Sequence, residues 1–114
     1  MSSWVKHRFE HLRRWREYAE IMAKATKDLC SNCKVYVFGG VAEGRVTVLS
    51  DIDILVVSEG KLTDTEIKEI WINIMKRAMD VYSLPFDAPV ELHVVDKERA
   101  VRYFTMAKKL IEIV

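Results

Sequence analysis

The sequence predicts an α+β fold in which a small mixed β-sheet carries helices on one face, in the order α-β-β-α-β-α. Two observations lead to this prediction: a long amphipathic segment opens the chain, and three short β-branched runs are separated by turn and helix signals. Because 114 residues are too few for a three-layer interior, we expect residues 1–114 to form a single domain.

Composition and charge exclude several classes of protein. Hydrophobic residues make up 50% of the chain and charged residues 31%, which is typical of a globular protein and not of a disordered or collagen-like one. The formal net charge of +1 argues against attraction of the whole molecule to nucleic acid or membrane. No apolar run approaches the roughly 18 residues of a membrane span. The N-terminal stretch lacks an apolar signal core, so we expect a cytoplasmic protein.

Helical periodicity marks residues 3–29 as one long helix. Apolar side chains recur there at spacings of three and four, which places them on one helix face. Thr63 and Glu66 have the spacing of a capping box that opens a second helix. Asp96 can cap a last helix, which we expect to run to about Glu112.

Three runs have the β-branched and apolar composition of strands, namely residues 34–38, 52–57 and 90–95. Gly39 and Gly40 end the first run. The segment 41–50 is expected to be a loop with at most one helical turn.

Two features leave alternatives open. Cys30 and Cys33 form a single C-x-x-C pair before the first strand, and they are either a buried pair or a disulfide. The apolar end of the chain, residues 110–114, is expected to pack on the domain or, in a homo-oligomer, on another subunit.

Acidic residues on two of the predicted strands share one face of the sheet. Because side chains alternate along a strand, Asp51 and Asp53 point to the same side, and so do Glu91 and His93. Neighbouring strands are about 4.8 Å apart, so the three carboxylates can converge in a suitable register. Clustered carboxylates repel one another unless a cation compensates, and oxygen ligands with vacant positions for phosphate describe a Mg²⁺ site.

An Asp-x-Asp pair also occurs on the solvated face of ordinary antiparallel sheets, so the pair alone does not decide. The glycine pair favours a functional interpretation. Backbone N–H groups at a turn after Gly39 and Gly40 can hold phosphate, and glycine permits its close approach. A dinucleotide-binding fingerprint and a P-loop are both absent from the sequence. A phosphate cradle beside a carboxylate cluster therefore suggests nucleotide chemistry of another kind.

The segment FGGVAEGRVTVLSDIDILVV, within residues 37–57, resembles the signature of nucleotidyltransferases related to DNA polymerase beta. It is most similar to the minimal nucleotidyltransferases of prokaryotes. That signature is an apolar strand, Gly followed by Gly or Ser, about a dozen residues, and Asp-x-Asp with apolar flanks. A third acid follows on a later strand, and Glu91 in PVELHVV matches it in type and setting.

The resemblance implies roles for individual residues. Asp51 and Asp53 would hold two Mg²⁺ ions, and Glu91 would be the third acid of the metal and catalytic site, helping to activate the attacking hydroxyl. Gly39 and Gly40 would bind the triphosphate. We expect Arg45 and Ser50 to contribute to nucleotide binding as well, with Arg45 supplying positive charge near the phosphates.

The resemblance also implies a reaction and a partner. A hydroxyl attacks the α-phosphate of a nucleoside triphosphate and releases pyrophosphate, and members of the family usually use ATP and transfer AMP. Minimal nucleotidyltransferases are typically paired with a small helical HEPN-domain protein, often as antitoxin and toxin. We therefore expect the acceptor to be a hydroxyl on such a partner, and tyrosine in particular.

Two departures from the family pattern keep other hypotheses open. Many relatives have Ser at the position of Gly40 and Arg at the position of Glu43. The chain could accordingly be a binding module with weak or lost catalysis, which neutralises its partner by contact. A third hypothesis, RNA binding through the basic first helix, is disfavoured by the balanced net charge.

Overall fold

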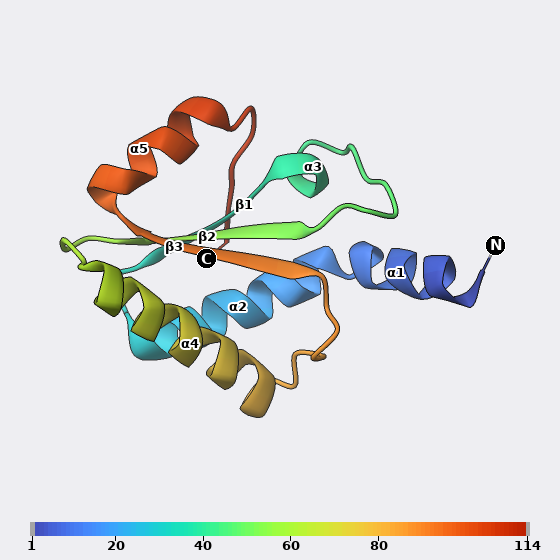
Figure 1. Cartoon of the computed structure of the whole chain (residues 1–114), viewed down its shortest axis with the longest axis horizontal. Helices are drawn as coiled ribbons and strands as arrows, with labels where there is room; N and C mark the ends of the chain where they lie inside the picture. The colour runs from blue at the N-terminus through green and yellow to red at the C-terminus, as the bar shows by residue number, and fades with distance from the viewer. Residues whose placement is uncertain (1, 114) are drawn as a thin grey trace.

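A computed structural model describes residues 2–113 of the protein and shows the predicted α+β class (Figure 1). The predicted order of elements is present. The helical turn that the sequence allows after the first strand forms a short helix, and a fourth strand is added near the end. In chain order the elements are α1 Ser3–Arg13, α2 Trp15–Leu29, β1 Lys34–Phe38, α3 Gly39–Ala42, β2 Ile52–Ser58, α4 Asp64–Asp80, β3 Val90–Asp96, α5 Lys97–Met106 and β4 Ile111–Ile113.

The strands of the described residues form one mixed sheet in the order β3-β2-β1-β4. Strand β1 pairs antiparallel with β2 and with β4, whereas β2 pairs parallel with β3. A parallel pair requires a crossover connection, and helix α4 provides it. Since β2 and β3 run in the same direction, both strands begin at the same edge of the sheet.

The main core lies between the sheet and helices α2 and α4, which share one face of the sheet in Figure 1. Strand β2 buries Ile52, Ile54 and Val56 on this face, and helix α2 buries Tyr18 and Met22 against them. This arrangement agrees with the prediction of helices packed on one side of a small sheet.

Helix α5 departs from that arrangement and lies on the opposite face of the sheet (Figure 1). Leu55, Val57 and Val95 are buried beneath it in a second, smaller cluster with Ala100. Strand β2 is therefore covered on both faces along its second half. The first half, which carries Asp53, stays uncovered by α5.

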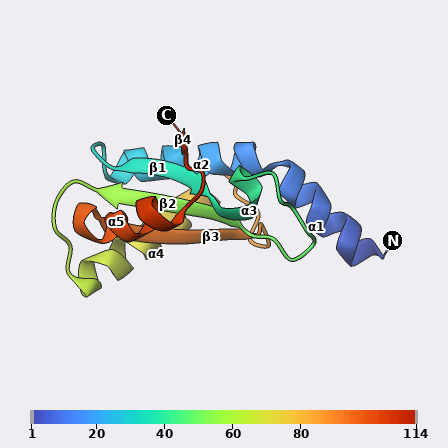
Figure 2. The same cartoon turned by 90° about the horizontal axis from the view of Figure 1, so that it is seen from above.

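The predicted single helix over residues 3–29 is wrong, because the helix is interrupted at Arg14. Arg14 has φ −89° and ψ 17°, and its N–H donates to the carbonyl of His11, one residue short of the α-helical partner. Its guanidinium donates to the Glu17 carboxylate. The apolar spacing continues across the break, so periodicity alone does not reveal it. Helix α1 consequently leaves the body of the domain at a different angle from α2 (Figure 2).

The prediction that the last helix runs to about Glu112 is also wrong. Helix α5 ends at Met106, and Ile111 and Ile113 alternate with Glu112 in strand β4, which pairs with β1. Both isoleucines pack in the main core, so this end of the chain packs on its own domain. Val114 lies outside the described residues.

Two smaller predictions concern the cysteines and the membrane. Cys30 and Cys33 are joined in a disulfide between α2 and β1, which selects one of the two alternatives left open by the sequence. None of the helices in residues 2–113 combines the length and apolar composition that a membrane span requires.

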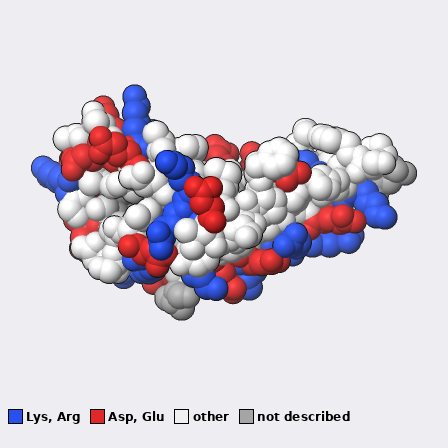
Figure 3. Space-filling view, turned by 90° about the horizontal axis from the view of Figure 1, so that it is seen from below, with Lys and Arg blue, Asp and Glu red and all other residues white. Residues whose placement is uncertain are grey.

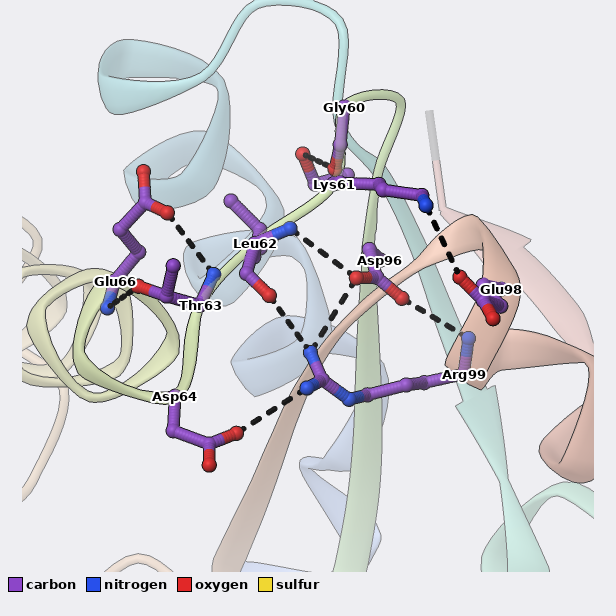
Figure 4. Close-up of polar contacts among 10 residues, drawn as sticks. Gly60, Lys61, Leu62, Thr63, Asp64, Glu66, Asp96, Glu98 and Arg99 are labelled. Carbon is purple, nitrogen blue, oxygen red and sulfur yellow. Dashed lines mark hydrogen bonds and ion pairs between the residues drawn. The ribbon is translucent and has the colours of Figure 1, made fainter.

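Asp96 links three segments at the end of the sheet opposite the acidic edge (Figure 4). Its carboxylate accepts hydrogen bonds from the backbone N–H groups of Leu62, at 3.1 Å, and Arg99, at 3.0 Å. The first contact fixes the loop before α4, and the second caps α5. The side chain of Arg99 extends the network to Asp64. These contacts hold α5 in its position over the sheet.

We expect the substitution Asp96→Ala to destabilise the protein more than Thr63→Ala, which removes a single cap and costs about 1 kcal/mol. The two backbone N–H groups hold the pKa of Asp96 below its usual value of 3.8. The stabilisation by Asp96 is thus present above that pH and is lost as the pH falls through the lower folded-state pKa. Urea denaturation from pH 7 to pH 2 measures both effects. Equal stability of the two variants at pH 7 would contradict the assignment.

Candidate functional site

Asp53 and Glu91 face each other across the parallel strands β2 and β3. They are register partners in the ladder, and His93 follows Glu91 on the same face of β3. One ligand atom from each of the three side chains lies within 4.8 Å of the others. The structure thus brings together two of the three carboxylates that the sequence singled out, and it adds an imidazole.

His93 presents a buried ring nitrogen to both carboxylates. Its Nε2 atom lies 3.8 Å from Asp53 Oδ1 and 3.7 Å from Glu91 Oε1, beyond hydrogen-bonding distance. Among the described residues this nitrogen has no hydrogen-bond partner. The hydroxyl of Tyr103 lies 3.3 Å from Nδ1 and steadies the ring from the other side. A buried, unsatisfied nitrogen beside two carboxylates fits a site for a cation.

Burial and the neighbouring negative charge together raise the pKa of Glu91. Burial is the largest cause that raises the pKa of Glu91, followed by the negative charge of Asp53, while His93 acts in the opposite direction. A bound divalent cation would remove this repulsion, because it favours the ionised form of both acids. The electrostatics therefore agree with the cation site that the geometry suggests.

Asp51 does not join this cluster. It precedes the first residue of β2, and its Oδ1 atom accepts a hydrogen bond of 3.0 Å from the guanidinium of Arg8 on α1. Arg8 also donates to the carbonyl oxygens of Val48 and Ser50. Arg8 thus holds the loop before β2 as well as its acidic residue. The alternation along β2 alone did not predict this long-range contact.

Gly39 and Gly40 begin the short helix α3 directly beside Asp53. Gly39 has φ +75°, a conformation that side chains disfavour, and a Cβ atom at this position would collide with Asp53 Oδ2. A Cβ atom at Gly40 would lie 2.8 Å from the carbonyl oxygen of Arg45. The absence of Ser at position 40, a departure from the family pattern, therefore has a steric reason in this chain.

Arg45 and Ser50 are engaged within the loop that follows α3. The guanidinium of Arg45 donates twice to Glu43 Oε1, at 3.1 and 2.8 Å. This ion pair neutralises the carboxylate that would otherwise repel a triphosphate. The hydroxyl of Ser50 accepts a hydrogen bond of 2.8 Å from the N–H of Thr47. Both side chains thus bond within the loop and support it.

A pocket of about 540 Å³ opens next to the cluster, between α3 and α5. Its wall includes Phe38 and Tyr103, whose rings also contact the ring of His93. Arg102 of α5 contributes positive charge to the same wall, which also includes Arg99, whose guanidinium is paired with Asp64 and Asp96. The sequence does not point to these residues, because its pattern predicts the last helix on the other face of the sheet. Nothing in the sequence around Tyr103, which lies within the helix capped by Asp96, indicates that its ring faces a pocket.

Comparison with known protein families identifies the class. The model of the nucleotidyltransferase domain matches residues 18–111, so the chain belongs to the nucleotidyltransferase domain family. This finding supports the family that the sequence motif predicted, and it defines the protein as a minimal nucleotidyltransferase domain with a general nucleotidyl-transfer function. Comparison with curated proteins finds no match.

Two solved structures have the same fold. A candidate nucleotidyltransferase from Sulfolobus solfataricus is 21% identical, with a TM-score of 0.62 over 98% of this chain and 87% of that chain. A second candidate nucleotidyltransferase is 24% identical, with a TM-score of 0.57 over 81% of this chain and 92% of that chain. At these identities the two structures support the fold, whereas the family match carries the class.

We expect Gly39→Ala to destabilise the protein more than Gly44→Ala. Both glycines have φ +75°, so both substitutions carry the cost of a left-handed residue, about 1 kcal/mol. A Cβ atom at Gly44 meets nothing within 4 Å, whereas one at Gly39 meets Asp53. The difference between the two variants in urea denaturation therefore isolates the collision with Asp53. Equal destabilisation by the two substitutions would show that position 39 is not in contact with Asp53.

We expect Glu91→Gln to stabilise the metal-free protein at neutral pH. Because the folded-state pKa of Glu91 lies above its usual value of 4.5, ionisation of Glu91 weakens the folded state as the pH rises through that interval. The stability advantage of the variant should be absent below pH 4.5, grow above it and then level off. Added Mg²⁺ should stabilise the wild type more than the variant. Denaturation with EDTA and with Mg²⁺ tests this, with the exposed Glu112→Gln as control.

Proposed function

We propose that the protein is a Mg²⁺-dependent adenylyltransferase, which transfers AMP from ATP to a hydroxyl group. The observation that supports this most directly is the meeting of Asp53, Glu91 and His93 beside the Gly39 turn. The family match supports nucleotidyl transfer in general. ATP as the substrate, Mg²⁺ as the metal and AMP as the transferred group are the finer parts of the proposal.

The residues present fit a divalent metal. Asp53 and Glu91 would supply its oxygen ligands, and Asp51 could be added once its bond with Arg8 is broken. When bound, Mg²⁺ would neutralise negative charge on the phosphates and on the attacking oxygen. Two ions are the number that the resemblance implies.

The side chains of the protein mainly position the reactants in this proposal. The turn at Gly39 and Gly40 lets a triphosphate approach Asp53 without a side chain between them. The pocket between α3 and α5 offers room for the nucleoside, with the ring of Tyr103 and the positive charge of Arg102 on its wall. Glu91, ionised beside the cation, would accept the proton of the attacking hydroxyl, the role that the resemblance implies.

The acceptor in this proposal is a tyrosine hydroxyl on a helical HEPN-domain protein, and the two proteins form an antitoxin and toxin pair. Support comes from the resemblance to minimal nucleotidyltransferases. The use of ATP implies a cytoplasmic location. On the face drawn in Figure 3, basic and acidic side chains are interspersed. Nucleic acid is therefore not the acceptor that we propose, since a nucleic-acid-binding surface gathers basic side chains.

A second candidate function is favoured by the ion pairs of the loop between α3 and β2. Arg8 forms an ion pair with Asp51, and Arg45 forms one with Glu43. Charged groups that could bind a metal or a nucleotide are thus paired within the protein. In this candidate the protein binds and neutralises its partner without catalysis. Titration with ATP separates the two candidates, because only the enzyme should bind ATP more tightly when Mg²⁺ is added.

We expect the purified protein to transfer label from α-labelled ATP to the HEPN-type partner when Mg²⁺ is present. Asp53→Asn should lower the rate about 100-fold or more, since each loss of 1.4 kcal/mol in transition-state stabilisation is about tenfold and a metal supplies several kcal/mol. Asp80→Asn, an exposed aspartate on α4, is the matched control and should label at the wild-type rate. Equal labelling by the wild type and by Asp53→Asn would defeat the proposal.

A further inference from the structure

A second group of metal-binding side chains lies outside the nucleotide site. His7 and His11 are one turn apart on α1, and Asp87 belongs to the loop that precedes β3. None of the three takes part in the proposed transfer reaction. Together they bring two imidazole nitrogens and a carboxylate to one point, from segments that are 80 residues apart in the sequence.

The distances within this group match the ligand set of one ion. The Nε2 atoms of His7 and His11 lie 3.1 Å apart. Asp87 Oδ2 lies 2.8 Å from the Nε2 atom of His7, and Asp87 Oδ1 lies 3.4 Å from the Nε2 atom of His11. Ligand atoms bound tetrahedrally to zinc at about 2.0–2.1 Å are separated by about 3.3 Å. The two nitrogens and one oxygen of the Asp87 carboxylate could therefore contact one ion with only small adjustments.

A buried contact behind His11 supports the same interpretation. Its Nδ1 atom lies 2.6 Å from the hydroxyl oxygen of Tyr18, which is fully buried. When Nδ1–H donates to this oxygen, Nε2 keeps its lone pair and faces His7 and Asp87. Metal-binding histidines are usually oriented by such a partner on the other ring nitrogen. The ring of His11 is thus held in the direction that metal binding requires.

The types of ligand favour a transition metal over magnesium. Two imidazoles and one carboxylate suit Zn²⁺, whereas Mg²⁺ prefers oxygen ligands and retains water. The side chains of His7 and Asp87 are 59% and 41% exposed, so an ion can enter and a fourth ligand can come from water.

We propose that His7, His11 and Asp87 form a zinc site that fastens α1 to the loop before β3. Helix α1 projects from the body of the domain in Figures 1 and 2, so a metal link would limit its movement. Arg8 lies between the two histidines in the sequence and binds Asp51. A zinc ion at this position would therefore also hold Arg8 against the loop that leads into the nucleotide site.

The test uses tag-free full-length protein carrying Asp53→Asn and Glu91→Gln, so that the nucleotide site contributes little metal binding. Equilibrium dialysis against Zn²⁺ should find one ion per chain, and Co²⁺ should show the visible absorption of a tetrahedral site. His7→Ala in the same background should bind Zn²⁺ at least about 100-fold more weakly, because loss of even an outer partner costs about 10–100-fold. Tyr18→Phe should weaken binding about tenfold or more.

The control is Glu10→Ala, an exposed residue on the same helix, which should bind Zn²⁺ like the background protein. In otherwise wild-type protein, His7→Ala should lower the zinc stoichiometry by one ion per chain. Hydrogen exchange should show greater protection of α1 when zinc is added, and His7→Ala should abolish that gain. Unchanged zinc affinity in His7→Ala, no zinc binding by the background protein, or displacement of zinc by millimolar Mg²⁺ would each overturn the proposal.

Discussion

The parallel register of β2 and β3 is the constraint on which the candidate site depends. It pairs Asp53 with Glu91, and it pairs Ile54 with Leu92 one residue further on. A slip of one residue would turn Glu91 toward the main core and Leu92 toward solvent, since side chains alternate along a strand. The burial of the apolar pair thus fixes the acidic pair on the other face. In this fold the core determines where the charges can be.

Local sequence patterns were sufficient for the parts of the structure that depend on neighbouring residues. Alternation placed Asp53 and Glu91 on the uncovered face, and the capping box at Thr63 marked the start of α4. The α+β class followed from the same short-range signals. The individual roles of Asp51, Asp53 and Glu91 as metal ligands stay predictions.

Features that depend on distant contacts could not be predicted in this way. The bond between Arg8 and Asp51 joins residues 43 positions apart, and helix periodicity does not report such a partner. Strand β4 has only three residues, Ile111–Ile113, too few for alternation to outweigh a helical interpretation. The crossing of α5 to the other face has a weak signal in β2, where Leu55 and Val57 follow Asp53 on the same face.

The close approach of Gly39 to Asp53 has a consequence for how the protein can change during evolution. Any side chain at position 39 would occupy the space of the aspartate carboxylate. A descendant of this chain could accept such a side chain only by shortening or losing the acid at position 53. The turn and the acid should therefore be inherited together or lost together, and a lineage that abandons one has little reason to retain the other.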